Sequence, residues 1–282
     1  MKKYLSLIKF SHTIFAMPFA LIGFFLAIRK EQFEWFTLIY ILLCMVFARS
    51  AAMAFNRYID RDIDTKNPRT SKIREIPNGN IEANNALIFV IICSLLFIIS
   101  TYLINNICFY LSPVALIIIL GYSFTKRFTS LCHIALGLGL SLSPIGSYLA
   151  VTGKFNIIPV LFSIAVLFWV CGFDIIYSLQ DEEFDKKQNL HSFPVLLGKR
   201  KSLIFSKFFH FIAIIILLLI GHNFEFNSFY WLGYSIFSIL ILYQHSLVSE
   251  YDLSKINLAF FTTNGIASVI FGFFVILDII LK

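Results

Sequence analysis

The sequence predicts an all-α membrane protein, with nine transmembrane helices in a bundle around a central cavity and the N-terminus in the cytoplasm. Hydrophobic residues make up 59% of the 282 residues and charged residues only 14%, which a soluble domain rarely matches. Apolar runs of about 20 residues recur, the length that crosses a hydrocarbon layer of about 30 Å. The alternating segments of about ten residues that are typical of a membrane β-barrel are absent from the sequence.

The nine predicted helices follow from the apolar runs. Lys2 and Lys3 precede the first run as in a signal peptide, but no small-residue cleavage site precedes Arg29 and Lys30, so we expect a helix there. The fourth run is only just long enough to span. The runs lie near 10–28, 36–56, 84–104, 107–123, 130–151, 157–178, 202–221, 228–247 and 257–281.

The orientation is predicted from the Lys and Arg residues of the loops. With the N-terminus in the cytoplasm, eighteen of these residues fall on the cytoplasmic side and four on the other side. This asymmetry is the positive-inside pattern of membrane proteins. It also explains the net charge of +7, so we expect lipid contact and no nucleic-acid binding.

We expect residues 1–282 to form one membrane domain, because no Gly/Ser-rich linker divides the chain. The only sizeable polar segments lie near 57–83 and 179–201, both on the predicted cytoplasmic side, and the Phe193-Pro194 pair is predicted to break any helix in the second. The five cysteines are scattered through apolar runs without the spacing of a redox or zinc motif, which favours buried structural roles.

Each polar segment carries an acidic cluster. If the second helix continues past the membrane edge, Arg49, Asn56, Asp60 and Asp64 lie within an arc of about 100° of its surface. Asp62 points elsewhere and is predicted to be a solvated partner of nearby arginines.

The sixth helix repeats this pattern at the start of the second polar segment. Asp174, Tyr177, Asp181 and Asp185 lie within an arc of about 80° of its surface, and Glu183 falls on the opposite side. The sequence therefore predicts two carboxylate-bearing faces at the same membrane edge.

Carboxylates aligned in this way repel one another, and a divalent cation with oxygen ligands removes the repulsion. Mg²⁺ is the natural candidate, because it combines one or two carboxylates with substrate phosphates. The alternative is that both clusters are solvated helix ends that balance their basic flanks. Arg49 favours a functional site, because a cation inside a membrane helix costs about 2.5–3.5 kcal/mol and usually faces a cavity with a partner.

These residues resemble the UbiA superfamily of intramembrane aromatic prenyltransferases over nearly the whole chain. The N-x-x-x-D-x-x-x-D motif of that family is matched by Asn56, Asp60 and Asp64, and its D-x-x-x-D motif by Asp181 and Asp185. Arg57 departs from the many members that place Asp after the Asn, and is similar to a bacterial branch labelled 4-hydroxybenzoate polyprenyltransferase. Further resemblance lies in residues 12–20, 67–70, 122–126 and 192–198.

The resemblance implies a prenyl transfer reaction in the bacterial cytoplasmic (inner) membrane. The polyprenyl group of a polyprenyl diphosphate would pass to a ring carbon of 4-hydroxybenzoate, or of a naphthoate-type acceptor in menaquinone synthesis. Mg²⁺ would be held by Asp60, Asp64, Asp181 and Asp185. The diphosphate would be bound by Asn56, Arg57, Arg61, Arg69 and Lys126.

Three further assignments are hypotheses. Asp174 is a candidate proton acceptor or a group that orients the aromatic acceptor, and Arg49 could hold the carboxylate of that acceptor by a bidentate pair. Tyr177 or Phe173 could stabilise an allylic cation face-on.

Two other classes of protein remain as alternatives. A divalent-cation transporter could use the carboxylates, although transporter sites normally lie near the bilayer midplane and these clusters lie at its edge. A phospholipid head-group transferase would carry a D-x-x-D-G-x-x-A-R pattern, which is missing from the sequence.

Overall fold

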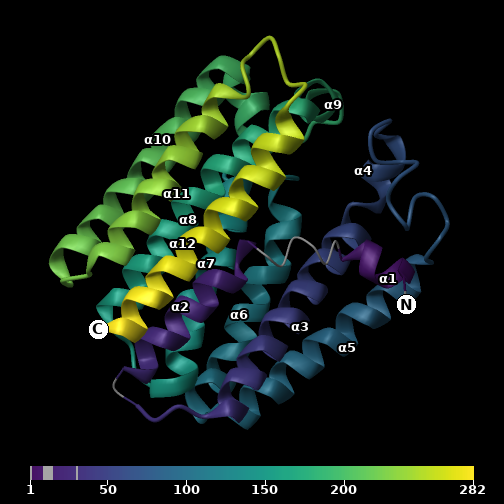
Figure 1. Ribbon diagram of the computed structural model, residues 1–282. Helices are drawn as coiled ribbons and strands as arrows, with labels where there is room; N and C mark the ends of the chain where they lie inside the picture. The colour runs from purple at the N-terminus through teal and green to yellow at the C-terminus, as the bar shows by residue number, and fades with distance from the viewer. Residues whose placement is uncertain (1, 9–14, 30) are drawn as a thin grey trace.

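The computed structural model describes residues 2–8, 15–29 and 31–282, and the described part is helical (Figure 1). A short helix, α1 (Lys2–Leu7), is followed by the long elements of the bundle. These elements are α2 (Met17–Ile28), α3 (Trp35–Ile59), α5 (Ala83–Ile104), α6 (Asn106–Thr125), α7 (Cys132–Thr152), α8 (Ile157–Ser178), α10 (Phe193–Asn223), α11 (Ser228–Ser246) and α12 (Asn264–Leu281), the last preceded by a π-helical stretch, η3 (Leu258–Thr263). Three short elements, α4 (Arg61–Lys66), the 3₁₀ turn η2 (Leu179–Asp181) and α9 (Glu182–Lys187), lie in the two polar segments.

The protein is an integral membrane protein by the length and composition of its helices. Within the described residues, seven helices are long and apolar enough to span a membrane. The other two predicted spans are α2, described over only 12 residues, and α11, whose 19 residues include several Ser and Tyr. Residues 10–14, the predicted start of the first helix, lie outside the described part of the chain.

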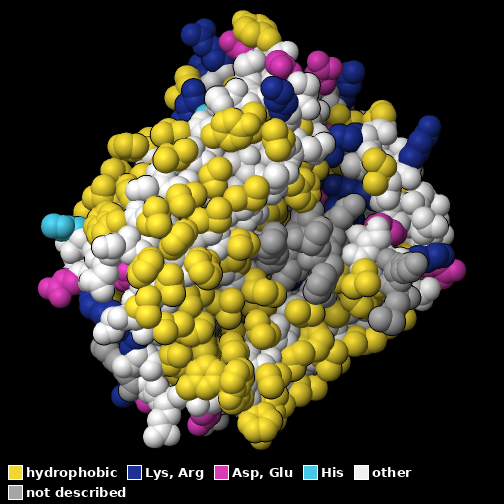
Figure 2. Space-filling model, viewed as in Figure 1, with side chains coloured by type: hydrophobic (Ala, Val, Ile, Leu, Met, Phe, Trp, Pro, Cys, Tyr) yellow, Lys and Arg dark blue, Asp and Glu magenta, His cyan; other side chains and the backbone are white. Residues whose placement is uncertain are grey.

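The surface of the molecule agrees with this assignment. Figure 2 shows hydrophobic side chains over most of the visible flank, with charged side chains gathered toward its two ends. Large apolar side chains such as Ile91, Ile117 and Phe211 are exposed on α5, α6 and α10. Contact of such an apolar flank with lipid tails is favourable, whereas its exposure to water would cost free energy.

Helix α8 is the most enclosed element of the bundle. Trp169 is buried between α2, α11 and α12, with ring contacts to Phe19 and Phe237. On the opposite side, a Cβ added at Gly137 of α7 would lie 2.7 Å from the carbonyl oxygen of Leu167, so only glycine permits this approach of α7 to α8. The close packing fixes the position of the polar end of α8.

The helices α3, α5 and α6 form a second group, packed against α7 (Figure 1). Between α3, α5, α6 and α7 lies a cavity of about 390 Å³. The short elements α4 and α9 lie at the same end of the bundle (Figure 1). Both acidic clusters therefore share one end of the molecule, as the sequence predicted.

Helix α10 differs from its predicted bounds of 202–221. It begins at Phe193, because the Ser192 hydroxyl caps it by accepting from the backbone N–H of Val195 and Pro194 occupies its first turn. No helix continues from α9 through the Phe193-Pro194 pair, as predicted, but the pair also starts a new helix, which the prediction did not include. Gly198, at φ 77°, kinks the helix between the membrane edge and the span.

Candidate active site

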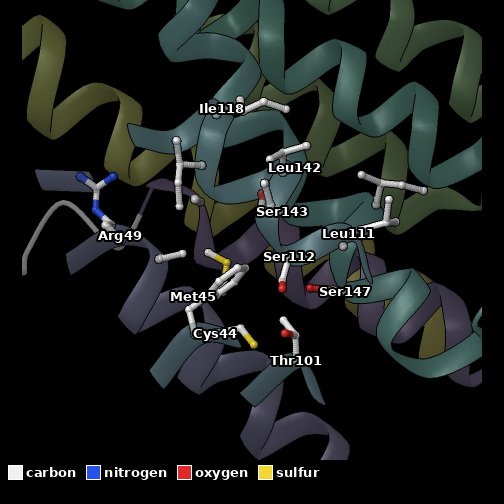
Figure 3. A pocket seen from close by; sticks show the side chains of 18 of the residues that line it. Cys44, Met45, Arg49, Thr101, Leu111, Ser112, Ile118, Leu142, Ser143 and Ser147 are labelled. Atoms are coloured by element: carbon white, nitrogen blue, oxygen red, sulfur yellow. The ribbon is translucent and has the colours of Figure 1, made fainter. Parts of the chain in front are cut away.

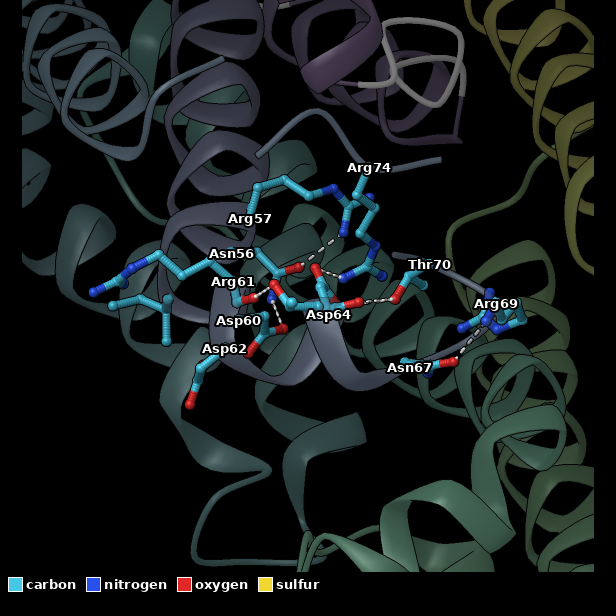
Figure 4. A network of polar contacts seen from close by, with 12 residues as sticks. Asn56, Arg57, Asp60, Arg61, Asp62, Asp64, Asn67, Arg69, Thr70 and Arg74 are labelled. Carbon is cyan, nitrogen blue, oxygen red and sulfur yellow. Dashed lines mark hydrogen bonds and ion pairs between the residues drawn. The ribbon is translucent and has the colours of Figure 1, made fainter. Parts of the chain in front are cut away.

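The first acidic cluster forms where α3 ends. Asp60 caps α3 in a non-helical conformation, so the helix does not run on continuously as predicted. Two backbone bonds nevertheless keep the four-residue spacing, since Asp60 N–H donates to Asn56 O at 2.9 Å and Asp64 N–H to Asp60 O at 2.8 Å. Asn56, Asp60 and Asp64 therefore lie together as the sequence predicts (Figure 4). Asp60 and Asp64 are 1% and 2% exposed.

Each buried carboxylate of this cluster has a basic partner. The Asp60 carboxylate accepts from the Asn56 amide at 3.0 Å and lies 2.6 Å from Lys126 Nζ. Asp64 pairs with Arg74 and accepts from the Thr70 hydroxyl. Buried carboxylates without such partners would not stay ionised.

Burial raises the pKa of the Asp60 carboxyl above its usual range, although Lys126 acts to lower it. The other carboxylate oxygen of Asp60, Oδ1, is buried and has no hydrogen-bond partner among the described residues. Arg57 contacts Asn56 Oδ1 at 3.3 Å, and its buried Nε is likewise without a partner in the described part of the chain. Buried polar atoms of this kind can bind a ligand that enters between the clusters.

The second cluster is joined to the first polar segment. Arg69 donates from Nε to Asp181 Oδ1 at 3.0 Å and from Nη2 to Asp181 Oδ2. Asn67 also donates to Asp181 Oδ1 at 3.2 Å, and its own Oδ1 accepts from the backbone N–H of Arg69 at 2.9 Å. The loop after α4 is therefore bound to the turn between α8 and α9.

Asp185 lies within electrostatic range of Asp181, Asp60, Lys126 and Arg69. The two clusters thus face one another across the basic side chains. Among residues 2–8, 15–29 and 31–282, no three His, Cys, Asp or Glu side chains gather at one point that could hold a metal ion. The acids form pairs, a donor set that suits a cation whose other ligands come from a phosphate group.

Asp62 and Arg61 lie away from these pairs. Asp62 is exposed and accepts from Arg127 at 2.7 Å, which lowers the pKa of its carboxyl. It is a solvated partner of an arginine, as predicted. Arg61 donates to the carbonyl oxygen of Tyr58 and covers the Tyr58 ring, so the structure does not bring it to the carboxylates (Figure 4).

Arg49 lies deeper than the acids and lines the cavity (Figure 3). Its Nε is buried without a hydrogen-bond partner among the described residues. The cavity wall is mostly apolar, and the hydroxyls of Thr101, Ser112 and Ser147 lie across it from Arg49 in Figure 3. A guanidinium at the wall of an apolar cavity is suited to binding an anionic group on an otherwise apolar ligand.

The two remaining predicted catalytic residues differ in position. Asp174 lies within electrostatic range of Tyr122, which lines the cavity and is also in range of Arg49 and Asp60. Tyr177 is farther away, since its hydroxyl accepts from Arg69 at 3.2 Å and its ring packs on Phe260. Phe173 is buried in the core against Trp169. The structure therefore gives Tyr177 a role in supporting Arg69 and leaves Phe173 out of the cavity wall.

Sequence reasoning missed three side chains of the site. It predicts no role for Arg74 or Asn67, although these residues contact Asp64 and Asp181. It also omits His133, whose Nδ1 lies 2.7 Å from Asp174 Oδ2. An ionisable side chain in an apolar helix is itself a signal of function, and that signal could have identified His133.

The chain is similar to one protein family over most of its length. The model of the UbiA prenyltransferase family matches residues 16–266. The 4-hydroxybenzoate octaprenyltransferase of Francisella tularensis subsp. mediasiatica is 30% identical over 80% of this chain and 79% of its own length. The enzyme of the same name from Photobacterium profundum is 27% identical over 83% of this chain and 81% of its own length.

Solved structures show the same fold. The apo structure of a UbiA homolog from Aeropyrum pernix K1 matches with a TM-score of 0.85 and 30% identity, covering 95% of this chain and 98% of that one. A UbiA homolog from Archaeoglobus fulgidus, bound to GPP and Mg²⁺, matches with a TM-score of 0.74 and 22% identity, covering 98% and 99%. The chain belongs to the UbiA prenyltransferase family and is an enzyme that transfers prenyl groups.

Proposed function

We propose that the protein transfers a polyprenyl group from a polyprenyl diphosphate to a ring carbon of 4-hydroxybenzoate in quinone biosynthesis, and that the reaction requires Mg²⁺. One observation carries this proposal: carboxylates of both acidic clusters pair with basic side chains near an apolar cavity, and the cavity wall includes Arg49, whose buried Nε has no partner among the described residues. The acid pairs suit the metal and diphosphate, the cavity suits the isoprenoid chain, and Arg49 suits an acidic acceptor.

The donor set fits magnesium. Asp60, Asp64, Asp181 and Asp185 offer hard oxygen ligands in two pairs, and the buried Oδ1 of Asp60 has no partner among the described residues. Magnesium bound there would neutralise charge on the diphosphate as it leaves. The relatives from Archaeoglobus fulgidus bound to GPP or DMAPP also hold Mg²⁺, which supports the proposal.

Three basic side chains of the candidate site would bind the diphosphate. Arg57, Arg69 and Lys126 contact Asn56, Asp181 and Asp60, so a phosphate between the clusters would lie within their reach. They stabilise negative charge at the point where it develops, which lowers the barrier to breaking the carbon–oxygen bond. The electron pair of that bond leaves with the diphosphate.

The deeper residues act on the aromatic acceptor. The Arg49 guanidinium holds the carboxylate of the acceptor and so orients its ring toward the allylic carbon. A ring carbon supplies the electron pair of the new carbon–carbon bond and then loses its proton. Asp174 accepts this proton.

The location of the site follows from the same residues. We propose that the protein lies in the bacterial cytoplasmic (inner) membrane with both acidic clusters facing the cytoplasm. The excess of Lys and Arg in the loops at that end of the bundle supports this orientation.

The test is an acceptor panel. Membranes that contain the protein are supplied with Mg²⁺, one prenyl diphosphate, and either 4-hydroxybenzoate or a dihydroxynaphthoate, and the products are identified by mass spectrometry. We expect C-prenylated 4-hydroxybenzoate. If only the naphthoate is prenylated, the proposed acceptor is wrong and the proposed prenyl transfer stands. If no acceptor is prenylated and the protein takes up metal ions into proteoliposomes, the transporter alternative is favoured.

A further inference from the structure

The carboxylate of Asp174 is held by a histidine that the sequence motifs do not include. His133 of α7 is 2% exposed, and its Nδ1 lies 2.7 Å from Asp174 Oδ2, on α8. The two residues are 41 positions apart. Gly137, one turn along α7 from His133, allows the close packing of the two helices that brings the pair together.

The other side of the imidazole fixes its protonation. The backbone N–H of Phe193 donates to His133 Nε2 at 3.3 Å. An imidazole nitrogen that accepts a hydrogen bond carries no proton, so the ring is neutral and its hydrogen lies on Nδ1. His133 therefore donates to Asp174 and cannot pass a proton onward through Nε2.

Within the described part of the chain, no hydrogen bond reaches the second carboxylate oxygen of Asp174. Oδ2 is engaged by His133, while the Asp174 side chain as a whole is 21% exposed. A carboxylate held at one oxygen keeps a fixed orientation and presents its other oxygen to a substrate. His133 itself is enclosed, so it can act on a bound substrate through Asp174 and not by direct contact.

The segment that anchors His133 also anchors the diphosphate end of the site. His191 N–H donates to the carbonyl oxygen of Lys126 at 2.7 Å, and the Cys132 thiol donates to the carbonyl oxygen of His191. The Phe193 ring packs on the His133 ring at 5.6 Å between centroids. Residues 191–193 thus hold both the lysine that pairs with Asp60 and the histidine that pairs with Asp174.

We propose that His133 is a positioning residue for prenyl transfer, which orients the Asp174 carboxylate by a hydrogen bond from Nδ1 and makes no contact with either substrate. The inference rests on the proposed function, in which Asp174 accepts the ring proton. In this proposal a neutral histidine holds the catalytic base, Asp174, in place, and residues 191–193 hold the histidine.

The test compares two substitutions of similar size. In His133→Asn the amide nitrogen can occupy the position of Nδ1 and still donate to Asp174, while in His133→Gln the longer chain places the amide near Nε2. Because a small displacement of a catalytic group can cost about 100-fold in rate, we expect His133→Gln to lose about 10- to 100-fold in kcat and His133→Asn to recover most of it. The KM for the prenyl diphosphate should not change in either variant.

Two controls and one double variant separate positioning from folding. His245→Asn removes the hydrogen bond between His210 and His245, at 2.8 Å, on α10 and α11. Apart from Phe193 at the start of α10, neither helix carries a residue of the proposed site or its support, so this variant should leave kcat unchanged. Thermal unfolding in detergent reports the stability of every variant. In an Asp174→Asn background, His133→Gln should cause no further loss of kcat, because the two residues act as one unit.

The outcomes are distinguishable. Wild-type protein that prenylates no acceptor overturns the proposed function itself. Active wild-type protein with equal kcat in His133→Gln and His133→Asn, or additive losses in the double variant, overturns the role of His133 alone.

Discussion

Arg69 donates to both carboxylate oxygens of Asp181, a residue 112 positions further along the chain. This bidentate pair joins the loop after α4 to the turn between α8 and α9, and so holds the two acidic clusters at a fixed separation. Arg69 also donates to the Tyr177 hydroxyl at 3.2 Å, which fixes the plane of the guanidinium. Arginine contacts therefore join the two parts of the candidate site.

Replacing Arg69 by lysine should weaken this assembly. Lysine keeps the charge but cannot bond both oxygens of Asp181 and the Tyr177 hydroxyl in one plane. The loss of one charge-assisted hydrogen bond costs roughly 1.5–3 kcal/mol, so we expect kcat/KM for the prenyl diphosphate to fall about 10- to 100-fold. Arg127→Lys is the matched control, because Arg127 pairs with the exposed Asp62; equal losses in both variants would contradict the role given to Arg69.

Asp60 and Asp62 offer a paired test of the metal role. Asp60 is buried beside Lys126, while Asp62 is exposed and paired with Arg127. A metal ion supplies several kcal/mol of charge stabilisation, so Asp60→Asn should lower kcat/KM by about 100-fold or more and Asp62→Asn should leave it unchanged. Initial rates over a magnesium titration measure kcat/KM for both variants. Full activity in Asp60→Asn would contradict the role of Asp60 in binding the metal.

The charge of Arg49 should matter for one class of acceptor. Arg49→Met keeps an unbranched apolar chain at this position but removes the charged guanidinium. The carboxylate of 4-hydroxybenzoate would then lie in the cavity without a partner, so KM for 4-hydroxybenzoate should rise by roughly 10-fold or more. KM for the prenyl diphosphate should not change. A phenol that lacks the carboxylate should react equally well with both proteins, and a loss of activity toward that phenol would indicate a structural role for Arg49.

As the medium is acidified, the reaction should stop at a higher pH than it would if Asp60 had the pKa of an ordinary aspartate. Burial raises the pKa of Asp60, so its carboxyl becomes protonated at a pH above the usual value of about 3.9 as the medium is acidified. The protonated form neither binds a cation nor pairs with Lys126. The acid limb of kcat/KM at subsaturating magnesium should therefore lie above that value and should move to lower pH as magnesium is raised, because the cation competes with the proton for the carboxylate. A limb at or below that value at low magnesium would contradict the shift.

The sequence was sufficient for the class of fold and for the polar ends of two helices. The apolar runs predicted the long helices, and the four-residue spacing brought Asn56, Asp60 and Asp64 together even though α3 ends at Asp60. That spacing survives because the backbone bonds continue across the cap. The predicted count of nine spans is supported for seven of them by length and composition within the described residues.

Contacts between distant segments could not be predicted. The pairs Arg74–Asp64, Arg69–Asp181 and His133–Asp174 depend on which faces of the helices meet, and helical periodicity does not define the rotation of one helix against another. The same limit explains Arg61, which shares the sequence neighbourhood of Asp60 but lies over the Tyr58 ring. The start of α10 at Phe193 depends on a capping hydroxyl and an N-terminal proline, and a proline in a polar segment predicts a helix stop as readily as a helix start.

The measurement that tests the central claim most directly is product formation by the purified protein in lipid nanodiscs, supplied with a polyprenyl diphosphate and 4-hydroxybenzoate, with magnesium, with EDTA, and with magnesium restored. We expect C-prenylated 4-hydroxybenzoate with magnesium, its loss with EDTA, and its return when the metal is restored. Undiminished product formation in EDTA, or no prenylated product under any of the three conditions, would contradict the account.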